Sequence, residues 1–391
     1  MTKKSDAPAI RFKGFSDAWE QRKAIDIADY SKGNGYSKGD LTDAGTPIIL
    51  YGRLYTKYQF AISEVDTFAV PRNGAVYSQG NEVIVPASGE TAEDIARASA
   101  VEKSGVMLGG DLNILRPFDF ISPLFLALAI SNGEPQKELA KKAQGKSVVH
   151  IHNTDIQEVT IAYPSRTEQD RIVSVFRQLD NLITLHQRKF EKLTNVKKSM
   201  LEKMFPQNGS SYPEIRFKGF TDPWEQRKLG DIASDMVAGG DIDKDLILAE
   251  GQYPVIANAL TGDGIVGYYD KEYRVNAPAV TVTGRGDVGH AKARLVNFTP
   301  VVRLLSVKSE HDVFFLENAI NTLKIVIEST GVPQLTVPQL AKYEVAFPRQ
   351  LDEEEHIGAF FKQLDNLITL HQRELEKLQN IKKSMLEKMF V

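Results

Sequence analysis

The chain has no cysteine among its 391 residues. This absence excludes a disulfide framework, a thiolate nucleophile and any cysteine-based zinc or iron–sulfur site. Long apolar runs are lacking too, because the longest, at residues 124–130, is far too short to cross a bilayer. Residues 1–8 lack the apolar core of a signal peptide. We therefore expect a soluble, cytoplasmic protein.

An excess of positive charge is also missing. The chain carries 48 basic and 51 acidic residues, which gives a net charge of -3. Residues 24–155 hold 12 basic and 16 acidic side chains, and residues 229–339 hold 9 and 14. Proteins that coat nucleic acid are usually basic, because neutralising phosphates drives their affinity. If this chain binds nucleic acid, it needs local patches or partner proteins to do so well.

Catalytic motifs are few, and their surroundings do not suit them. Residues 140–147 (AKKAQGKS) are one residue away from a phosphate-binding P-loop, but a helical stretch precedes them and a strand follows, the reverse of what that loop requires. We interpret this as a chance match. Residues 284–289 fit G-x-G-x-x-G, yet no helix is expected after them, so we favour a tight hairpin loop. We find no methyltransferase motif, helicase set or metal-ligand spacing, and we expect no catalytic residue, metal or cofactor in this chain.

Two blocks of sequence occur twice. Residues 10–23 recur at 215–228 with 12 of 14 positions identical, and residues 178–205 recur at 363–390 with 24 of 28 identical. The two middle segments between these blocks show no resemblance to each other. Uniform drift after a duplication would not preserve the ends and erase the middles. The ends therefore share one task, and the middles answer to two different demands.

A long amphipathic helix is predicted over residues 168–205 and again over the second copy. Its apolar positions are spaced three and four residues apart, as in the seam of a heptad pattern. Acidic residues open each helix and lysines close it, which suits the helix dipole. The helix needs a partner, and the obvious one is the other copy. His186 and His371 lie mid-seam, where we expect packing with a side-chain hydrogen bond rather than metal binding or catalysis. An antiparallel pair centred on them would bring Lys189 near Glu374, unless these are two solvated positions that drifted.

Each middle segment is predicted to be a small mixed α+β domain. In the first, strands are expected at 47–51, 75–77, 82–85 and 112–115, and helices at 123–131 and 134–143. In the second, strands are expected at 253–256, 279–283, 293–297 and 301–307, and a helix at 314–329. The chain then divides into a first domain (1–164), a first constant helix (165–207), a second domain (208–348) and a second constant helix (349–391).

The repeated ends contain motifs that identify a family. They are residues 11–15 (RFKGF) and 19–22 (WEQR), the second copies of both, and the helices preceded by residues 164–172 and 348–357. Short peptides inside the middle segments, such as residues 109–117 and 283–286, are individually weaker signals. On these residues the chain resembles the DNA-specificity subunit of a type I restriction–modification enzyme over almost its whole length.

The resemblance implies an α+β fold: two mixed α/β target-recognition domains joined by two long antiparallel coiled-coil helices, with an internal pseudo-two-fold repeat. Each domain would read one half of a split double-stranded DNA target, and the paired helices would set the spacing between the halves. The helices would dock two methyltransferase (modification) subunits, and two restriction (translocase and nuclease) subunits would join them. S-adenosylmethionine, ATP and Mg are then expected on those partners, with no catalysis in this chain.

Two alternatives compete with this interpretation. One is an enzyme that uses either glycine-containing loop, and the missing companion motifs count against it. The other is a pure coiled-coil scaffold, which does not explain why the middle segments diverged while the helices did not.

Residues that read bases are sought among Arg, Lys, Asn, Gln, Ser and Thr on loops that reach the major groove, whereas other contacts only position the DNA. In the first domain a basic–aromatic cluster and a polar loop supply the candidates: Tyr36, Ser37, Lys38, Arg53, Tyr55, Lys57, Tyr58, Ser88, Glu90 and Thr91. In the second domain the candidates are Asn258, Tyr268, Thr283, Arg285, His290 and Lys292. An ordinary solvated loop position is the alternative for each of them.

Overall fold

The computed structural model describes residues 8–145, 148–326 and 333–390. The chain folds as two compact units. The first unit combines Met1–Leu185 with Leu375–Val391, and the second consists of His186–Glu374. Each unit therefore contains one middle segment and a part of each long helix. Within the described ranges, no helix is long and apolar enough to cross a membrane.

The main sheet of the first unit has the strand order β2-β12-β8-β10-β5. The strands are β2 (Ala28–Lys32), β12 (Leu112–Pro117), β8 (Glu82–Pro86), β10 (Ser99–Val101) and β5 (Ala61–Ile62). The central strand β8 is buried along its whole length. The helix α3 (Pro123–Ile130) packs on β8, β10 and β12. All of its residues are apolar, as expected for a helix whose residues from Phe125 onward are buried.

A smaller sheet in the first unit has the order β3-β6-β4-β11-β7 and encloses a second core around Ile49, Leu54 and Leu108. Its strands are β3 (Leu41–Thr42), β6 (Phe68–Ala69), β4 (Thr46–Ile49), β11 (Ser104–Leu108) and β7 (Tyr77–Gln79). The other elements between the constant ends are η1 (Ala24–Asp26), η2 (Lys38–Asp40), α1 (Arg53–Thr56), β9 (Ser88–Gly89), α2 (Ala92–Ile95), α4 (Gly133–Lys142), β13 (Val149–His150) and α5 (Asn153–Gln157).

The second unit repeats the main sheet with an unrelated sequence. Its strand order β16-β22-β19-β20 matches β2-β12-β8-β10, and α8 (Val313–Asn321) packs on β19 and β20 as α3 packs on β8 and β10. The strands are β16 (Ala233–Ala238), β22 (Leu304–Ser309), β19 (Ala279–Thr283) and β20 (Ala291–Arg294). A smaller sheet contains β18 (Ile265–Tyr269), β17 (Tyr253–Ile256) and β21 (Thr299–Pro300), and the short helices are α7 (Leu229–Ile232), η3 (Lys244–Leu246), η4 (Gly262–Gly264) and α9 (Val337–Leu340). The predicted α+β architecture is confirmed in both middle segments.

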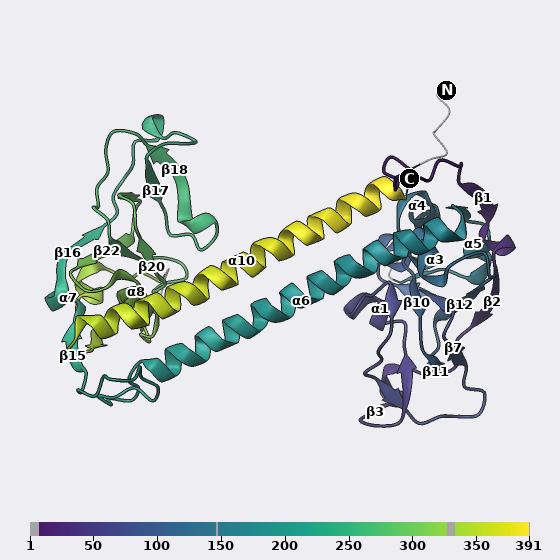
Figure 1. Cartoon of the computed structure of the whole chain (residues 1–391), viewed down its shortest axis with the longest axis horizontal. Coiled ribbons are helices and arrows are strands. Elements are labelled where there is room, and N and C mark those ends of the chain that lie inside the picture. Colours follow the sequence, from purple (N-terminus) through teal and green to yellow (C-terminus); the bar gives the residue numbers. More distant parts are fainter. Residues whose placement is uncertain (1–7, 146–147, 327–332, 391) are drawn as a thin grey trace. The chain divides into compact units, whose positions relative to one another are not determined.

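The two long helices are α6 (Arg166–Met204) and α10 (Leu351–Met389), as Figure 1 shows. They confirm the predicted helices to within a few residues, and in each unit a part of α6 pairs antiparallel with a part of α10. In the first unit Phe176 packs against Phe390, and the Asp180 carboxylate lies 2.5 Å from the Lys382 ammonium. The second unit has the equivalent ion pair, Lys197 with Asp365 at 2.6 Å.

The two seam histidines meet, as predicted. The Nδ1 atoms of His186 and His371 lie 3.1 Å apart, and both rings are half-buried. Desolvation, His186 and Lys189 lower the pKa of His371, which favours its neutral imidazole. The proximity of Lys189 to Glu374 stays a prediction.

The repeated segment at residues 10–23 is held in the same way as its second copy. Strand β1 (Glu20–Lys23) pairs with β14 (Thr160–Tyr163), and β15 (Glu225–Lys228) pairs with β23 (Glu344–Phe347). Trp19 packs edge-on against Phe390, and Trp224 packs edge-on against Phe205. Each repeated segment therefore rests on the end of a long helix, and these identical contacts explain why the two sequences match.

Several predicted elements have shifted bounds. The strand expected at 75–77 is β7, two residues later, and the one expected at 293–297 is β20, which begins at Ala291. The strand expected at 301–307 is β22, which begins at Leu304, and the one expected at 47–51 ends at Ile49. The helix expected at 314–329 is wrong beyond Asn321, and residues 327–329 lie outside the described part. Two causes end α8 there: the Asn321 amide bonds to the backbone of Ala291, and β-branched residues follow at 325 and 326.

Both glycine-containing loops have the structural surroundings expected from the sequence. Helix α4 precedes the P-loop-like stretch and β13 follows it, which is the inverted order expected from the sequence, although Lys146 and Ser147 lie outside the described residues. Residues 284–290 form the hairpin loop between the antiparallel strands β19 and β20, as predicted. In the part of the chain that the structure describes, the next element after each loop is a strand rather than a helix that could bind a phosphate.

Candidate nucleic-acid interface

Two loops meet at the same place in both units. In the first unit the loop after β8 contacts α1 through Tyr55, whose hydroxyl donates to the Ser88 carbonyl at 2.7 Å. In the second unit the loop after β19 contacts the segment after β17 through Asn258, whose Oδ1 accepts from the Gly284 amide at 2.8 Å. Because β8 and β19 hold the same position in the strand order, the two sites are equivalent. Each is called the two-loop site below: residues 51–59 with 87–91 in the first unit, and residues 257–263 with 284–292 in the second.

The two-loop site of the first unit is built around Arg97. The Arg97 guanidinium lies 5.6 Å from the ring centroid of Tyr55 and 5.4 Å from that of Tyr58. Burial raises the pKa of the Tyr55 hydroxyl, so it stays a neutral donor. The Ser88 hydroxyl lies 3.1 Å from Nδ1 of His150. The structure thus brings together three predicted residues, Tyr55, Tyr58 and Ser88.

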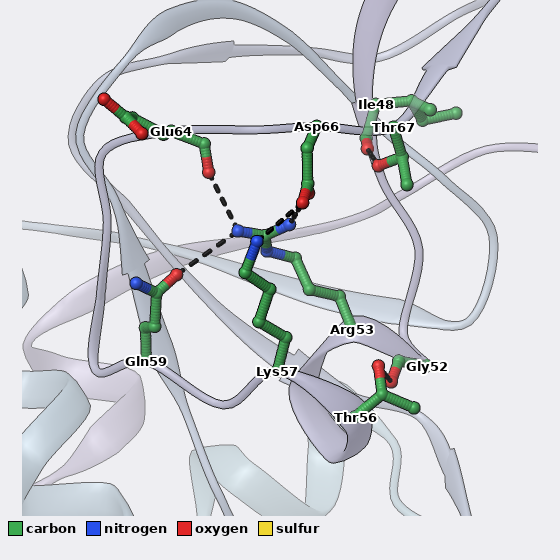
Figure 2. A network of polar contacts seen from close by, with 9 residues as sticks. All are labelled: Ile48, Gly52, Arg53, Thr56, Lys57, Gln59, Glu64, Asp66 and Thr67. Carbon is green, nitrogen blue, oxygen red and sulfur yellow. Dashed lines mark hydrogen bonds and ion pairs between the residues drawn. The ribbon is translucent and has the colours of Figure 1, made fainter. Parts of the chain in front are cut away.

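Arg53 and Lys57 serve a structural purpose at the edge of this site. The Arg53 guanidinium donates to Asp66 at 2.6 Å, to the Glu64 carbonyl at 2.8 Å and to the Gln59 side chain at 3.2 Å. Figure 2 shows how these groups surround it. The Lys57 ammonium also contacts Asp66, at 2.6 Å, and the two cations hold the pKa of that carboxyl well below its usual range. Only 8 % of the Arg53 side chain is exposed. Its donors therefore hold the 59–66 loop against α1 and are not presented to a DNA base.

Tyr36, Ser37 and Lys38 lie in a separate turn of the first unit. The buried Tyr36 hydroxyl accepts from the Arg72 amide at 2.7 Å and donates to a backbone carbonyl. Ser37 closes a capping box with Asp40, and these bonds, with the Arg72 guanidinium, lower the pKa of Asp40 to about 2. Lys38 is exposed. The predicted basic–aromatic cluster therefore has one part in this turn and another on or directly after α1, and contact of its residues with bases stays a prediction.

The polar loop after β8 is partly structural as well. Thr91 caps α2, because its hydroxyl accepts from the Asp94 amide at 3.1 Å. Glu90, the residue before it, is exposed. Ser88 is 8 % exposed and contributes its carbonyl and hydroxyl to the contacts with Tyr55 and His150. Glu90 is therefore the member of this loop with an accessible charged group.

In the two-loop site of the second unit, the side chains of Thr283 and Asn258 form hydrogen bonds that fix the shape of the hairpin loop. The Thr283 hydroxyl accepts from the His290 amide at 3.0 Å and donates to the Asp287 carbonyl at 2.6 Å. Asn258 also donates to a backbone carbonyl through its amide nitrogen, so both of its functional groups are engaged. Arg285 and His290 extend from this hairpin with exposed side chains. Thr283 and Asn258 thus shape the loop that presents Arg285.

A cavity of about 380 Å³ lies beside this hairpin, and Thr283, His290 and Lys292 line it. Lys292 forms an ion pair with Asp263 from the neighbouring loop. Glu317 of α8 also lines the cavity, and burial raises its pKa to about 7. Tyr268 is not among the lining residues; it lies on β18, opposite Pro254 and Leu248. Three of the six predicted residues of the second domain therefore line the cavity. Asn258 lies between the lining residues Ala257 and Ala259, Arg285 lies two residues after Thr283, and Tyr268 lies apart on β18.

Sequence reasoning missed Arg97, Asp263, Arg294 and Glu317. Arg97 lies in an alanine-rich stretch, and Glu317 lies in an apolar helix, so neither carries a loop or patch signal. Arg294 donates to Thr281 at 3.0 Å, and burial lowers its pKa. A charged residue within an apolar helix was the one available signal, because such a residue requires a local partner.

The described residues contain no group of three or more potential metal ligands. The loops of both two-loop sites follow central strands of the main sheets, β8 and β19. Exposed charged groups at these loops, such as Glu90 and Arg285, suit base-edge hydrogen bonding.

Comparison with known proteins agrees with this picture. The profile of the family described as "Type I restriction modification DNA specificity domain" matches residues 16–195 and 221–380. A protein of Mycoplasma pneumoniae that carries a provisional name as a type I specificity subunit is 26 % identical over 244 residues, which cover 61 % of this chain and 63 % of that protein. The specificity subunit of the type I restriction enzyme MjaVIII from Methanocaldococcus jannaschii is 20 % identical over 346 residues, covering 80 % of this chain and 79 % of that one.

A solved structure shares the fold. The S subunit of a type I restriction–modification system from M. genitalium has a TM-score of 0.73 and 16 % identity, and the alignment covers 98 % of this chain and 99 % of that one. The family profile matches most of the chain, in two copies that correspond to the two repeats. The chain belongs to the type I restriction–modification DNA-specificity family.

Proposed function

We propose that this chain is the DNA-specificity subunit of a type I restriction–modification complex, in which each middle segment reads one half of a split DNA target. The observation that supports this most strongly is the pair of two-loop sites. They occupy the same place in the same strand order, yet they are built from different residues, Tyr55 with Ser88 in one and Asn258 with Gly284 in the other. Equivalent positions with unlike side chains are what two unlike half-sites require.

The constant parts then serve what the two halves have in common. The paired helices set the spacing between the half-sites and dock two methyltransferase subunits, and two restriction subunits complete the complex. The chain itself performs no catalysis, and S-adenosylmethionine, ATP and Mg belong to the partners. Two copies of one partner need two like surfaces, and the near-identity of residues 178–205 and 363–390 supplies them. The acidic balance of both middle segments fits an affinity that comes mainly from the assembled complex.

The primary experiment is co-expression with the methyltransferase subunit encoded beside this chain, followed by mapping of methylated adenines on genomic DNA. We expect a split motif with unlike halves and a fixed gap. An assembled complex that adds no methylation would contradict the proposal.

The enzyme alternative has its own test. Ultraviolet crosslinking of labelled S-adenosylmethionine or ATP to the full chain alone is expected to give no saturable signal. Saturable labelling would overturn the assignment of catalysis to the partners.

Leu182 and Leu367 mark a candidate docking surface for the methyltransferase. They hold equivalent positions in the two repeats, and 43 % and 44 % of these residues are exposed. Exposed leucines on a polar helix surface are typical of partner contacts. The double substitution Leu182→Glu with Leu367→Glu is expected to weaken methyltransferase binding by about 30-fold or more, since a hot-spot residue contributes about 2 kcal/mol. Titration of the methyltransferase subunit with the full chain measures the change.

The matched control places the same charges on exposed aliphatic residues of the middle segments. Val70 and Leu246 are 62 % and 54 % exposed. The control double substitution to glutamate should leave methyltransferase binding within about twofold. Equal weakening in both variants would remove Leu182 and Leu367 from the docking surface.

Arg285 is the strongest base-reading candidate of the second unit. Its side chain is exposed in a hairpin loop that Thr283 and Asn258 hold in shape. Arg285→Ala is expected to relax recognition of one half-site by about 1–3 kcal/mol, the usual contribution of a bidentate contact to a base. Competition binding of the complex to intact targets and to targets altered in one half measures the change. The control is Lys271→Ala, another exposed cation of the second unit, which should leave the sequence preference unchanged.

A further inference from the structure

Consecutive residues near the start of each long helix hold different parts of the chain. Glu168 of α6 and Glu353 of α10 each accept two hydrogen bonds from an arginine of the repeated segment, Arg11 at 2.7 and 2.7 Å and Arg216 at 2.6 and 2.8 Å. Both glutamates are 1 % exposed. The chemistry is the same in both units because the partner segment is the same.

The next helix position contacts the variable part, and there the chemistry differs. Gln169 accepts from the Ser122 amide at 2.8 Å, and its own amide donates to the carbonyls of Phe120 and Pro164 at 3.0 and 2.9 Å. Glu354, at the equivalent position of α10, accepts from the Asp312 amide at 3.3 Å and from Nδ1 of His311 at 2.8 Å. Both side chains are fully buried.

These contacts are made with equivalent turns of the two units. Ser122 and Asp312 are the N-caps of α3 and α8, the helices that cover the two main sheets. The first turn presents the Phe120 carbonyl and the Ser122 amide, so the helix supplies an amide side chain, which can donate and accept. The second turn presents an imidazole, so the helix supplies a carboxylate. A carboxylate in place of Gln169 would face two carbonyl oxygens without a proton between them, a costly arrangement for a buried charge.

One helical turn further along each long helix, a second position differs between the two copies. Val173 of α6 corresponds to Gly358 of α10, and residues four apart share one face of a helix. A Cβ atom added to Gly358 would lie 2.0 Å from Oδ1 of Asp312. That oxygen cannot move away freely, because it accepts from the amides of Phe314 and Phe315 at 3.1 and 2.8 Å. Glycine inside a helix costs about 1 kcal/mol relative to alanine, so its presence here matches the larger cap residue.

We infer that residues 169 and 173 of α6, and 354 and 358 of α10, are positioning residues that match each long helix to its own variable domain. Gln169 and Val173 accept a domain whose α3 cap is serine, and Glu354 and Gly358 accept a domain whose cap is aspartate preceded by histidine. A recognition domain transferred without these two helix positions will therefore be held poorly. The inference rests on the proposed function only for its DNA readout.

A double-mutant cycle in the full chain tests the steric half of this inference. Gly358→Val is expected to lower the thermal midpoint by about 4 °C or more. Asp312→Ser in the same chain should restore most of that loss, because serine is the smaller cap residue at the equivalent position of the first unit. Val173 is buried in the core of the first unit, so the control Val173→Gly should lower the midpoint through lost packing, and Asp312→Ser should not restore that loss. Strictly additive effects of Gly358→Val and Asp312→Ser would overturn the inference.

Domain exchange tests the whole of it. Residues 24–164 replace residues 229–348 in two versions of the chain. One version keeps Glu354 and Gly358, and the other carries Glu354→Gln and Gly358→Val. The converted version is expected to have the higher thermal midpoint and, with the methyltransferase subunit, to methylate a target with two like halves at least tenfold faster. Equal midpoints and equal methylation in both versions would overturn the matching. Different midpoints with no methylation in either version would support the matching and count against the proposed function instead.

Discussion

Replacing Arg216 with alanine is expected to lower the free energy of unfolding by about 3–5 kcal/mol, because one partner of a buried ion pair is removed while the other stays. Only 1 % of the Glu353 side chain and 13 % of the Arg216 side chain are exposed. Without the arginine, the buried Glu353 carboxyl loses the two hydrogen-bond donors that Arg216 supplies. Chemical denaturation of the full chain measures the loss. Arg11→Ala should behave alike, since Arg11 pairs with Glu168 in the same geometry.

The matched control is Arg349→Ala in the same unit. Arg349 pairs with Glu225 at 3.1 Å, but these side chains are 54 % and 57 % exposed. Exposed ion pairs contribute about 0–1 kcal/mol. A comparable loss from Arg349→Ala and Arg216→Ala would show that burial does not decide the effect and would contradict the prediction.

The long helices could be predicted from sequence because their signal is local and repeated. An apolar residue every three or four positions, without proline, identifies a helix of almost forty residues whatever surrounds it. The short strands carry less signal, and β7 and β20 were displaced by two residues because a strand of three or four residues is defined by its neighbours in the sheet. Helix α8 ends at Asn321, whose side chain accepts a hydrogen bond from the Ala291 amide in strand β20. No local sequence pattern indicates such a contact.

The candidate site was harder to predict for the same physical reason. Arg53 is a surface-loop arginine by sequence, yet Asp66, 13 residues away, neutralises it within the fold. Arg97 was missed because its partners, the rings of Tyr55 and Tyr58, lie about forty residues earlier. Residue type indicates what a side chain is able to contact, whereas the fold decides whether a protein group has already taken that contact. Arg285 survives as a candidate because the hairpin presents it to solvent.

The balance of basic and acidic residues in the middle segments also has a structural explanation. Many of the cations in the middle segments are paired with carboxylates, as in Lys57 with Asp66 and Lys292 with Asp263. Such pairs hold loops in place but offer little net attraction to phosphate. On the proposed function, sequence preference then comes from a few exposed side chains and overall affinity from the partners. This division permits the middle segments to change their target without changing the complex.

Shortening both long helices by one heptad is expected to change the gap between the half-sites while the bases read stay the same. Deleting residues 183–189 together with 368–374 removes equivalent stretches of the two repeats and leaves the ion pairs of Asp180 with Lys382 and of Lys197 with Asp365 in place. Seven residues correspond to about 10 Å of helix, and at about 3.4 Å per base pair the gap should change by up to about three base pairs. Methylated-adenine mapping of the complex reads out both the bases and the gap.

A control separates spacing from helix pairing. His186→Leu with His371→Leu removes the polar contact at the seam but keeps the helix length, so the gap should stay as it is. An unchanged gap in the shortened chain, in a complex that assembles and methylates, would contradict the role of the helices as a spacer. A changed gap with unchanged bases requires that base recognition and spacing are carried by separate parts of the chain. That is the arrangement in which the two-loop sites read DNA and the constant helices hold them at a fixed separation.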